Sequence, residues 1–345
     1  MRQVWIPRAG DPEVLEVREA PDPAPGPGQV LIDVEAAGIN FADILARKGL
    51  YPDAPDLPAV VGYEVGGMVE AVGDGVEGLA VGDPVLSLTR FGGYSSKVVV
   101  PEAAVSKRPA GMSAETGAAI PVTYLTAFQM MVVMGSVRHA RELGGRRMRV
   151  LVHGASGGVG TAAGDLGQAY GAELIGAASP GKHAYVRERG YDHAVDYRQD
   201  DWPDVVLELT GGEGVDLVLD PIGGKHWAKS LRVLGPSGRL VIYGISSVTE
   251  GGGRLAFAKL ALGIPWLKFN PIRLINANQG VLGVNVGHLW SAQDRVAGWS
   301  RAILKLYESG DVKPHVDRTF SFAEAAAAHR YIEDRKNTGK VLLTP

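Results

Sequence analysis

The turn at residues 150–160, VLVHGASGGVG, places an apolar run directly before a glycine-rich segment. If a helix begins at the end of this segment, its first backbone N–H groups have no partner within the helix, and the helix dipole favours an anion there. Gly157, Gly158 and Gly160 let the main chain approach a pyrophosphate and let the helix pack closely on the strand. The spacing departs from the full G-x-G-x-x-G pattern, because Ala155 stands where a glycine is usual. The segment indicates a phosphate-binding turn, with a purely structural turn as the alternative.

The elements around this turn alternate between strand and helix patterns. Small and apolar residues recur at helical spacing after the glycines. Further strands are expected at residues 173–178, 194–197, 215–220, 239–243 and 280–286, and helices at 182–189, 201–209 and 224–234. Such alternation implies an α/β fold with a doubly wound parallel sheet of Rossmann type, which binds a dinucleotide at the carboxyl ends of its strands.

The end of the second strand indicates which dinucleotide is bound. An NAD site normally carries a carboxylate there, about 20 residues after the glycines, which accepts from the ribose 2′-hydroxyl. No Asp or Glu lies between Leu174 and Lys182. Ser179 and Lys182 instead offer a hydroxyl and an ammonium to a 2′-phosphate, and Tyr197 can add a hydroxyl or a stacking face. The pattern favours NADPH over NADH. The alternative is that Lys182 only lies in solvent at the start of a helix and contacts no cofactor.

The first 120 residues have a different pattern. Short strands separated by Gly, Pro and Asp turns are expected at residues 30–36, 63–72 and 94–100, which is typical of an antiparallel, barrel-like unit. From Met112 the pattern becomes helical, with Ser113 as the helix start. Strand-like pieces at residues 319–322 and 340–343 have no obvious partner in the parallel sheet, so we expect them to return to the first unit. The dinucleotide-binding domain, residues 123–301, is then an insertion in a catalytic domain of residues 1–122 and 302–345.

Composition predicts a cytoplasmic enzyme. The chain has 345 residues, of which 46% are hydrophobic, and a net charge of −3 gives no electrostatic footprint for nucleic acid. The beginning, MRQVWIPRAG, lacks the apolar core of a signal peptide. No uninterrupted apolar run reaches the ~18 residues that a membrane span needs. The absence of cysteine excludes disulfides and thiolate metal ligands.

Several motifs resemble a known superfamily. AGINFADILARKGLYP at residues 37–52, GYEVGGMVEAVGDGVEGLAVGDPV at 62–85, GGYSSKVVVP at 92–101, HGASGGVG and the ending KNTGKVLLTP are similar to the medium-chain dehydrogenases/reductases. More narrowly, they resemble the zinc-free quinone oxidoreductases. Within these, NFADILARKGLYP, DPIGG and VKPHVD with the ending KNTGKVLLTP are most similar to the synaptic-vesicle VAT-type branch. The similarity covers essentially the whole chain. It implies a chaperonin-cofactor-like β-barrel catalytic domain around the Rossmann domain, a cleft between them for nicotinamide and substrate, and a homodimer.

The resemblance also makes certain absences informative. Zinc-using relatives have a Cys where this chain has Asn40, and Gly-His-Glu where it has Gly62, Tyr63 and Glu64. Zinc catalysis needs three protein ligands and an open position. The eight histidines are scattered, with no pair at ligand spacing in a shared element. We therefore expect no catalytic metal.

Without a metal, hydrogen-bond donors must stabilise the negative charge that hydride transfer places on a carbonyl oxygen. The resemblance assigns this role to Asn40 and Tyr51, which match an Asn and a Tyr that line the nicotinamide cleft of quinone reductases, and Tyr63 can add a hydroxyl. The alternatives are that Asn40 caps the helix that follows it and that the two tyrosines are wall or core residues. Asp43 is interpreted as first-turn helix charge more than as a catalytic base, and no proton donor is assigned.

Further cofactor contacts are expected from elements that border the nicotinamide. Thr123 and Thr126, on the helix that leads into the Rossmann domain, are expected to meet the carboxamide or ribose. By resemblance, Lys340 approaches the cofactor's phosphates, with a surface role as the alternative. The remaining predicted contacts are Ala155, Gly157, Gly158, Val159, Ser179, Lys182, Tyr197, Tyr243, Gly244, Ile245, Gly283, Val284 and Asn285.

The predicted function is zinc-independent, NADPH-dependent hydride transfer to a small apolar quinone or α,β-unsaturated carbonyl. One alternative is an NADPH-binding, VAT-like lipid-binding or adaptor protein with little turnover, and another is an enoyl-thioester reductase. The unusually apolar residues 255–275 are interrupted by Lys259, Gly263, Pro265 and Lys268, so they do not span a membrane. They suit a lid, an oligomer contact or a peripheral membrane contact.

Overall fold

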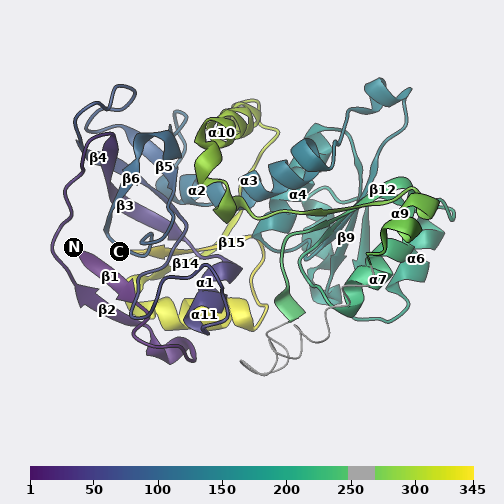
Figure 1. Cartoon of the computed structure of the whole chain (residues 1–345), viewed down its shortest axis with the longest axis horizontal. Helices are drawn as coiled ribbons and strands as arrows, with labels where there is room; N and C mark the ends of the chain where they lie inside the picture. The colour runs from purple at the N-terminus through teal and green to yellow at the C-terminus, as the bar shows by residue number, and fades with distance from the viewer. Residues whose placement is uncertain (248–268) are drawn as a thin grey trace. The chain divides into compact units, whose positions relative to one another are not determined.

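The computed structural model describes residues 1–247 and 269–345 and divides into two compact units (Figure 1). Unit 1 comprises Met1–Leu125, Gly287–Glu308 and Pro314–Pro345, and unit 2 comprises Thr126–Val286 and Ser309–Lys313. This division differs from the predicted domain boundaries, because residues 123–125 and 287–301 fall with unit 1 and residues 309–313 fall with unit 2.

Unit 2 is built on a six-stranded sheet with the order β10-β9-β8-β11-β12-β13. All its strand pairs are parallel. The strands are β8 (Arg149–His153), β9 (Glu173–Ala178), β10 (His193–Asp196), β11 (Val215–Asp220), β12 (Leu234–Ile242) and β13 (Gly280–Gly283). Counted along the chain, this order is 3-2-1-4-5-6, the dinucleotide-binding α/β arrangement, in which the strand order reverses between β8 and β11. The predicted Rossmann-type sheet is confirmed.

Four helices of unit 2 pack on this sheet through small or apolar residues: α4 (Gly158–Ala169), α5 (His183–Glu188), α6 (Trp202–Leu209) and α7 (Lys225–Arg232). The short helix α9 (Pro271–Ala277) has no buried residue, and α3 (Pro121–Phe128) contains the boundary between the units. On α4, a Cβ added to Gly167 would lie 2.5 Å from a methyl group of Leu174, so the glycine is needed for close contact with β9. Trp202 and Trp227 join Leu151 and Val218 in a buried cluster beneath α6 and α7.

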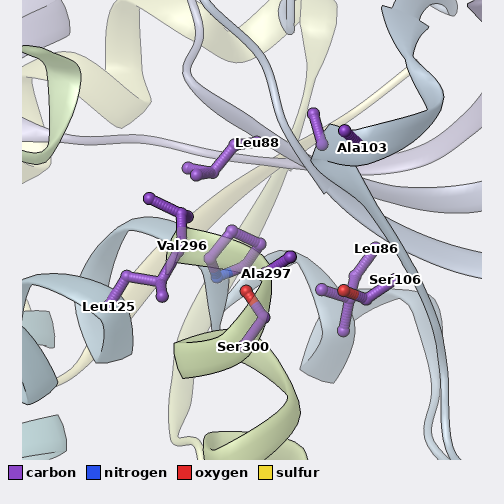
Figure 2. A pocket seen from close by; sticks show the side chains of 10 residues that line it. Leu86, Leu88, Ala103, Ser106, Leu125, Val296, Ala297 and Ser300 are labelled. Carbon is purple, nitrogen blue, oxygen red and sulfur yellow. The ribbon is translucent and has the colours of Figure 1, made fainter. Parts of the chain in front are cut away.

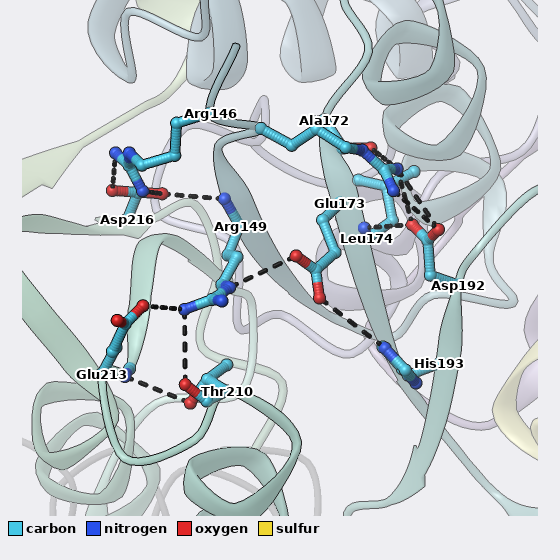
Figure 3. A network of polar contacts seen from close by, with 12 residues as sticks. Arg146, Arg149, Ala172, Glu173, Leu174, Asp192, His193, Thr210, Glu213 and Asp216 are labelled. Carbon is cyan, nitrogen blue, oxygen red and sulfur yellow. Dashed lines mark hydrogen bonds and ion pairs between the residues drawn. The ribbon is translucent and has the colours of Figure 1, made fainter. Parts of the chain in front are cut away.

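Ion pairs connect the amino ends of the strands in unit 2, as Figure 3 shows. Arg149, the first residue of β8, pairs with Glu173 at 3.2 Å and with Glu213 at 2.7 Å. The same network contains the pairs Arg146–Asp216 and Arg147–Asp192, at 2.7 and 3.0 Å. A doubly wound sheet binds its ligand at the carboxyl ends of its strands, and these charges lie at the opposite edge of the sheet.

Unit 1 contains a mostly antiparallel sheet in which β3 is central, and within it β14 and β15 pair in parallel. The strands run in the order β14-β15-β3-β4-β5-β7, and β6 also pairs with β3. They are β3 (Gln29–Gly38), β4 (Glu64–Val72), β5 (Pro84–Leu88), β6 (Lys97–Pro101), β7 (Val105–Lys107), β14 (Val316–Ser321) and β15 (Lys340–Thr344), beside a separate pair of β1 (Arg2–Trp5) and β2 (Glu16–Glu19). Since β15 is antiparallel to β3, the C-terminal strands return to the first unit as the sequence predicts.

The helices of unit 1 are α1 (Phe41–Arg47), α2 (Ala114–Ala118), α10 (Gln293–Glu308) and α11 (Ala325–Glu333). Ser113 begins α2, because its hydroxyl accepts from the backbone N–H of Thr116 at 3.2 Å. Figure 2 shows a small pocket where Val296, Ala297 and Ser300 of α10 face other residues of this unit. Its volume of about 20 Å³ suffices for a water molecule and not for an organic substrate.

Within the described residues, no helix is both long and apolar enough to cross a membrane. Of the apolar segment 255–275, residues 255–268 lie outside the described residues. The rest belongs mainly to α9, on which Ile272 and Ile275 are 67% and 72% exposed.

Candidate active site

The side-chain amide of Asn40 is held from both ends at the start of α1. Its Nδ2 donates to Oε1 of Glu64 at 2.9 Å, and its Oδ1 accepts from Nζ of Lys340 at 2.7 Å. A carboxylate only accepts and an ammonium only donates, so these partners fix the orientation of the amide. The second N–H of Nδ2 has only a weak contact, 3.5 Å from the carbonyl oxygen of Gly38, which a substrate oxygen can replace.

The partners of Asn40 are themselves buried and paired. Glu64 is fully buried and Lys340 is 3% exposed, and they form an ion pair at 2.5 Å. Lys340 also donates to the carbonyl oxygen of Ile39 at 2.8 Å, and Glu64 accepts from the backbone N–H of Val122 at 2.7 Å. All three N–H groups of the ammonium therefore have an acceptor. These contacts favour a role for Lys340 in holding Asn40 over the predicted contact with cofactor phosphates.

Asp43 forms a capping box with Asn40, which is the N-cap residue of α1 as the alternative prediction held. Its carboxylate accepts from the backbone N–H of Asn40 at 2.7 Å and from that of Gly62 at 3.0 Å. It is fully buried, which the interpretation as first-turn helix charge did not anticipate. Burial raises the pKa of Asp43 to about 7, against the opposing effects of the Asn40 hydrogen bond and the Lys340 charge. Asp43 thus joins the start of α1 to the residues just before β4.

Tyr63 lies between Tyr51 and Phe91. The ring centroids of Tyr63 and Tyr51 are 6.1 Å apart in an edge-to-face arrangement, and those of Tyr63 and Phe91 are 5.4 Å apart. Burial, followed by the charge of Asp43, raises the pKa of Tyr63 above its ordinary value, so its hydroxyl stays protonated. Among the described residues, this buried hydroxyl has no hydrogen-bond partner. Since an unsatisfied buried hydroxyl is costly, the arrangement suits a ligand that accepts a hydrogen bond.

The glycine turn of unit 2 suits a phosphate. Gly157 is the N-cap of α4, and no side chain caps the helix. A Cβ on Gly160 would lie 2.4 Å from the carbonyl oxygen of Gly154, whereas a Cβ on Gly157 would meet nothing closer than 3.5 Å. Gly160 therefore serves packing, and Gly157 leaves space outside the turn for a ligand. Ala155 is fully buried, and a Cβ added to Gly176 of β9 would lie 3.0 Å from its Cβ, so Gly176 leaves room for the methyl group that stands in place of the usual glycine.

The other cofactor residues predicted in unit 2 gather at the carboxyl ends of the parallel strands. Ser179 and Lys182 follow β9, Tyr197 follows β10, Tyr243, Gly244 and Ile245 follow β12, and Gly283, Val284 and Asn285 end or follow β13. Ala178 is in register with Asp196, so Ser179 and Tyr197 leave the sheet side by side. The structure thus brings these residues to the edge where a doubly wound sheet binds a dinucleotide.

Asp196 was missed because sequence reasoning looked for a carboxylate only at the end of the second strand. Its carboxylate lies at the neighbouring strand end and is bound by Arg198 at 2.9 and 3.0 Å. Arg198 lowers the pKa of Asp196 to about 2, chiefly through these hydrogen bonds. The carboxylate is therefore engaged by a cation of its own rather than offered to a ribose.

The two threonines of α3 fall in different units, Thr123 in unit 1 and Thr126 in unit 2. Both are buried. The hydroxyl of Thr123 donates to the carbonyl oxygen of Ala119 at 2.5 Å, so toward a cofactor it can only accept.

Comparisons with known proteins agree with this architecture. Residues 26–110 match the family model of the alcohol dehydrogenase GroES-like domain, and residues 189–343 match that of a zinc-binding dehydrogenase. The human synaptic vesicle membrane protein VAT-1 homolog is 37% identical over 332 residues, which cover 96% of this chain and 82% of that protein.

Two solved structures have the same fold over almost the whole chain. The quinone oxidoreductase of Escherichia coli, solved in complex with NADPH, has a TM-score of 0.87 at 28% identity and covers 100% of both chains. The CurK enoyl reductase has a TM-score of 0.84 at 28% identity, covering 99% of this chain and 98% of its own. The chain therefore belongs to the medium-chain dehydrogenase/reductase superfamily of oxidoreductases, in the family that contains the VAT-1 homologs.

Proposed function

We propose that this protein is an NADPH-dependent reductase that transfers hydride, without zinc, to a quinone or an α,β-unsaturated carbonyl compound. The observation that carries the proposal is the Asn40 amide, which Glu64 and Lys340 hold in one orientation. A donor that is already oriented stabilises the charge that develops on the substrate oxygen without reorganising during the reaction. The hydroxyls of Tyr51 and Tyr63 supply further donors.

The cofactor assignment rests on unit 2. NADPH supplies the hydride when it is bound. The uncapped start of α4 suits its pyrophosphate, and Ser179, Lys182 and Tyr197 would hold the 2′-phosphate at the ends of β9 and β10. The NADPH complex of the related quinone oxidoreductase supports this assignment.

Turnover tests the proposal directly. The loss of reduced-nicotinamide absorbance should be followed with NADPH and with NADH, against quinones, alkenals and long-chain enones. We expect turnover with NADPH, a kcat lowered by Asn40→Ala, and a KM for NADPH raised by Lys182→Ala. Enzyme stripped of metal should retain its kcat. If NADPH quenches tryptophan fluorescence but no acceptor is reduced, the VAT-like binding or adaptor function replaces the reductase.

The likeness to the CurK enoyl reductase favours one second candidate, an enoyl-thioester reductase. A pair of substrates that share one enoyl group, one as a thioester and one as a ketone, separates the two reactions. A much higher kcat/KM for the thioester would identify the second candidate, whereas preference for the ketone or for quinones supports the first.

A further inference from the structure

Three side chains that the proposed reaction does not use meet at the carboxyl ends of β8 and β11. They are His153, Asp220 and His226, and one possible ligand atom from each lies within 4.8 Å of the others. His153 ends β8 and Asp220 ends the neighbouring parallel strand β11. Two glycines with positive φ, Gly223 and Gly224, then turn the chain so that His226 returns in the first turn of α7. The fold therefore brings together three possible metal ligands whose spacing along the sequence does not indicate a metal site.

The charge in this cluster lacks a counter-ion. Asp220 is fully buried, and its oxygens accept from the backbone N–H groups of Ile222 and Gly223, at 2.7 and 3.2 Å, and from the hydroxyl of Ser230 at 2.8 Å. All three donors are neutral, and no ion pair within residues 1–247 and 269–345 includes Asp220. A buried carboxylate without an opposite charge is unfavourable, and a bound cation would supply that charge.

The imidazole of His153 provides a second, independent indication. His153 is fully buried, and its Nδ1 has no hydrogen-bond partner among the described residues. Its Nε2 lies 3.3 Å from the hydroxyl of Ser230, the residue that also donates to Asp220. Because the single hydroxyl hydrogen of Ser230 is donated to Asp220, the Nε2–H of His153 donates to the Ser230 oxygen, and a metal-ligating histidine normally donates its other ring N–H in this way. One nitrogen of His153 is thus positioned by Ser230, and the other is available as a ligand.

The surroundings suit a borderline transition-metal ion. Two imidazoles and one carboxylate are typical ligands of Zn²⁺ and of Co²⁺, and they leave a fourth position for water. The ring of Trp202 shields the cluster, since its centroid lies 4.8 Å from that of His153 and 5.5 Å from that of His226. Bonds of about 2 Å place tetrahedral ligands about 3.3 Å apart. His226, which is only half-buried, can make the small movement that closes this set.

We propose that His153, Asp220 and His226 bind one divalent transition-metal ion, Zn²⁺ or Co²⁺, within the dinucleotide-binding unit. The site shares no residue with Asn40, Tyr51 or Tyr63. It connects β8, β11 and α7 immediately before the turn that begins at Gly154, so the bound ion stabilises the start of that turn.

Binding is tested with the untagged full chain. After dialysis against Zn²⁺ and then against metal-free buffer, elemental analysis should find one ion per chain. Asp220→Asn preserves the side-chain shape, and His226→Ala alters a half-buried residue, so both should fold. Each should weaken Zn²⁺ binding at least about 10-fold. His193→Ala is the matched control, because this histidine lies on β10 of the same sheet, with its side chain 35% exposed, and should leave binding unchanged.

Thermal unfolding provides a second readout, separate from turnover. An ion that binds only the folded chain raises Tm, so Zn²⁺ should raise the Tm of the wild type and of His193→Ala, and not that of His226→Ala. In the Co²⁺-loaded protein, the visible absorption of four-coordinate cobalt should vanish with either ligand variant. No bound metal in the wild type, or equal binding by folded Asp220→Asn and His226→Ala, would overturn the proposal.

Discussion

Glu64 and Lys340, which carry opposite charges, orient the neutral side-chain amide of Asn40. Substitutions can therefore test the amide and its charged partners separately. If the amide of Asn40 donates to the developing oxyanion, Asn40→Ala removes that donor. We expect kcat to fall by about 10² to 10³, the usual loss for one such donor, with a small change in the KM for NADPH. Steady-state kinetics with a fixed acceptor measures both. A KM effect without a kcat effect would place Asn40 in cofactor binding instead.

A substitution at Lys340 distinguishes its predicted contact with the cofactor phosphates from its contacts with Asn40 and Glu64 in the structure. If Lys340 holds the amide of Asn40, Lys340→Met should lower kcat about 10-fold and leave the KM for NADPH nearly unchanged. If it binds phosphate, the KM for NADPH should rise instead. Because the single change leaves the buried Glu64 unpaired, the double variant Lys340→Met with Glu64→Gln serves as the control for lost stability. Stability recovered in the double variant without recovered kcat would confirm the orienting role.

The buried carboxyl of Asp43 predicts a pH dependence of stability. Its pKa is raised from 3.8 to about 7, so the folded state holds this proton more tightly than the unfolded state. The stabilisation is therefore fully present below pH 3.8 and is lost as the pH rises through about 7. Asp43→Asn should flatten the fall in Tm over this range, whereas Asp33→Asn, at an exposed position of β3, should not. Parallel Tm curves for wild type and Asp43→Asn would contradict the assignment.

Residue types were predictable at this site, but their pairings were not. Asn40 and Tyr51 could be proposed from the resemblance to quinone reductases, and Tyr63 because it stands where zinc-using relatives have a histidine. Glu64 and Asp43 were missed as partners, since their roles depend on contacts between distant parts of the chain. Lys340 reaches Asn40 only because β15 pairs with β3 in the register that sets Leu342 opposite Gly38. No local pattern specifies that register.

At the scale of elements, the two glycines at the start of α4 have different roles, although the sequence pattern does not distinguish them. Gly160 allows close packing, and Gly157 leaves space for a ligand. Gly160→Ala would place a methyl group 2.4 Å from the carbonyl oxygen of Gly154, so we expect a lower Tm or loss of folding. Gly157→Ala has 3.5 Å of clearance within the chain and should fold, yet it should weaken NADPH binding about 10-fold by obstructing the phosphate. Differential scanning fluorimetry and NADPH titration of tryptophan fluorescence distinguish the two. Equal NADPH affinity in Gly157→Ala and wild type would exclude a phosphate at this turn.

Strand positions in unit 2 followed the apolar pattern, whereas some boundaries did not. The sequence predicts a helix to residue 234 and a strand from residue 239, but α7 ends at Arg232 and β12 already begins at Leu234. Ser237 has a positive φ of 64° there, and the pairing of β11 with β12 shifts its register between Val215 and Leu217. The strand therefore continues through an irregularity in which turn residues keep their local conformation.

At the scale of the whole molecule, the edge of the parallel sheet bears on self-association. Within the described residues β13 pairs only with β12, so its other edge has unpaired N–H and C=O groups, and its Val281 and Leu282 are half-buried. Such an edge can pair with the same strand of a second copy across a two-fold axis, which is the homodimer that the resemblance predicts.

We expect a dimer in sedimentation velocity at micromolar concentration, and Leu282→Lys should shift it toward monomer, because a charge at the paired edge opposes strand association. Val81→Lys is the matched control, since it places the same charge at an apolar position that is 66% exposed in unit 1. If the wild type is a monomer, β13 is not a dimer interface. If both Leu282→Lys and Val81→Lys remain dimeric, the interface lies on another surface. The comparison of these two variants therefore tests the edge of β13 specifically.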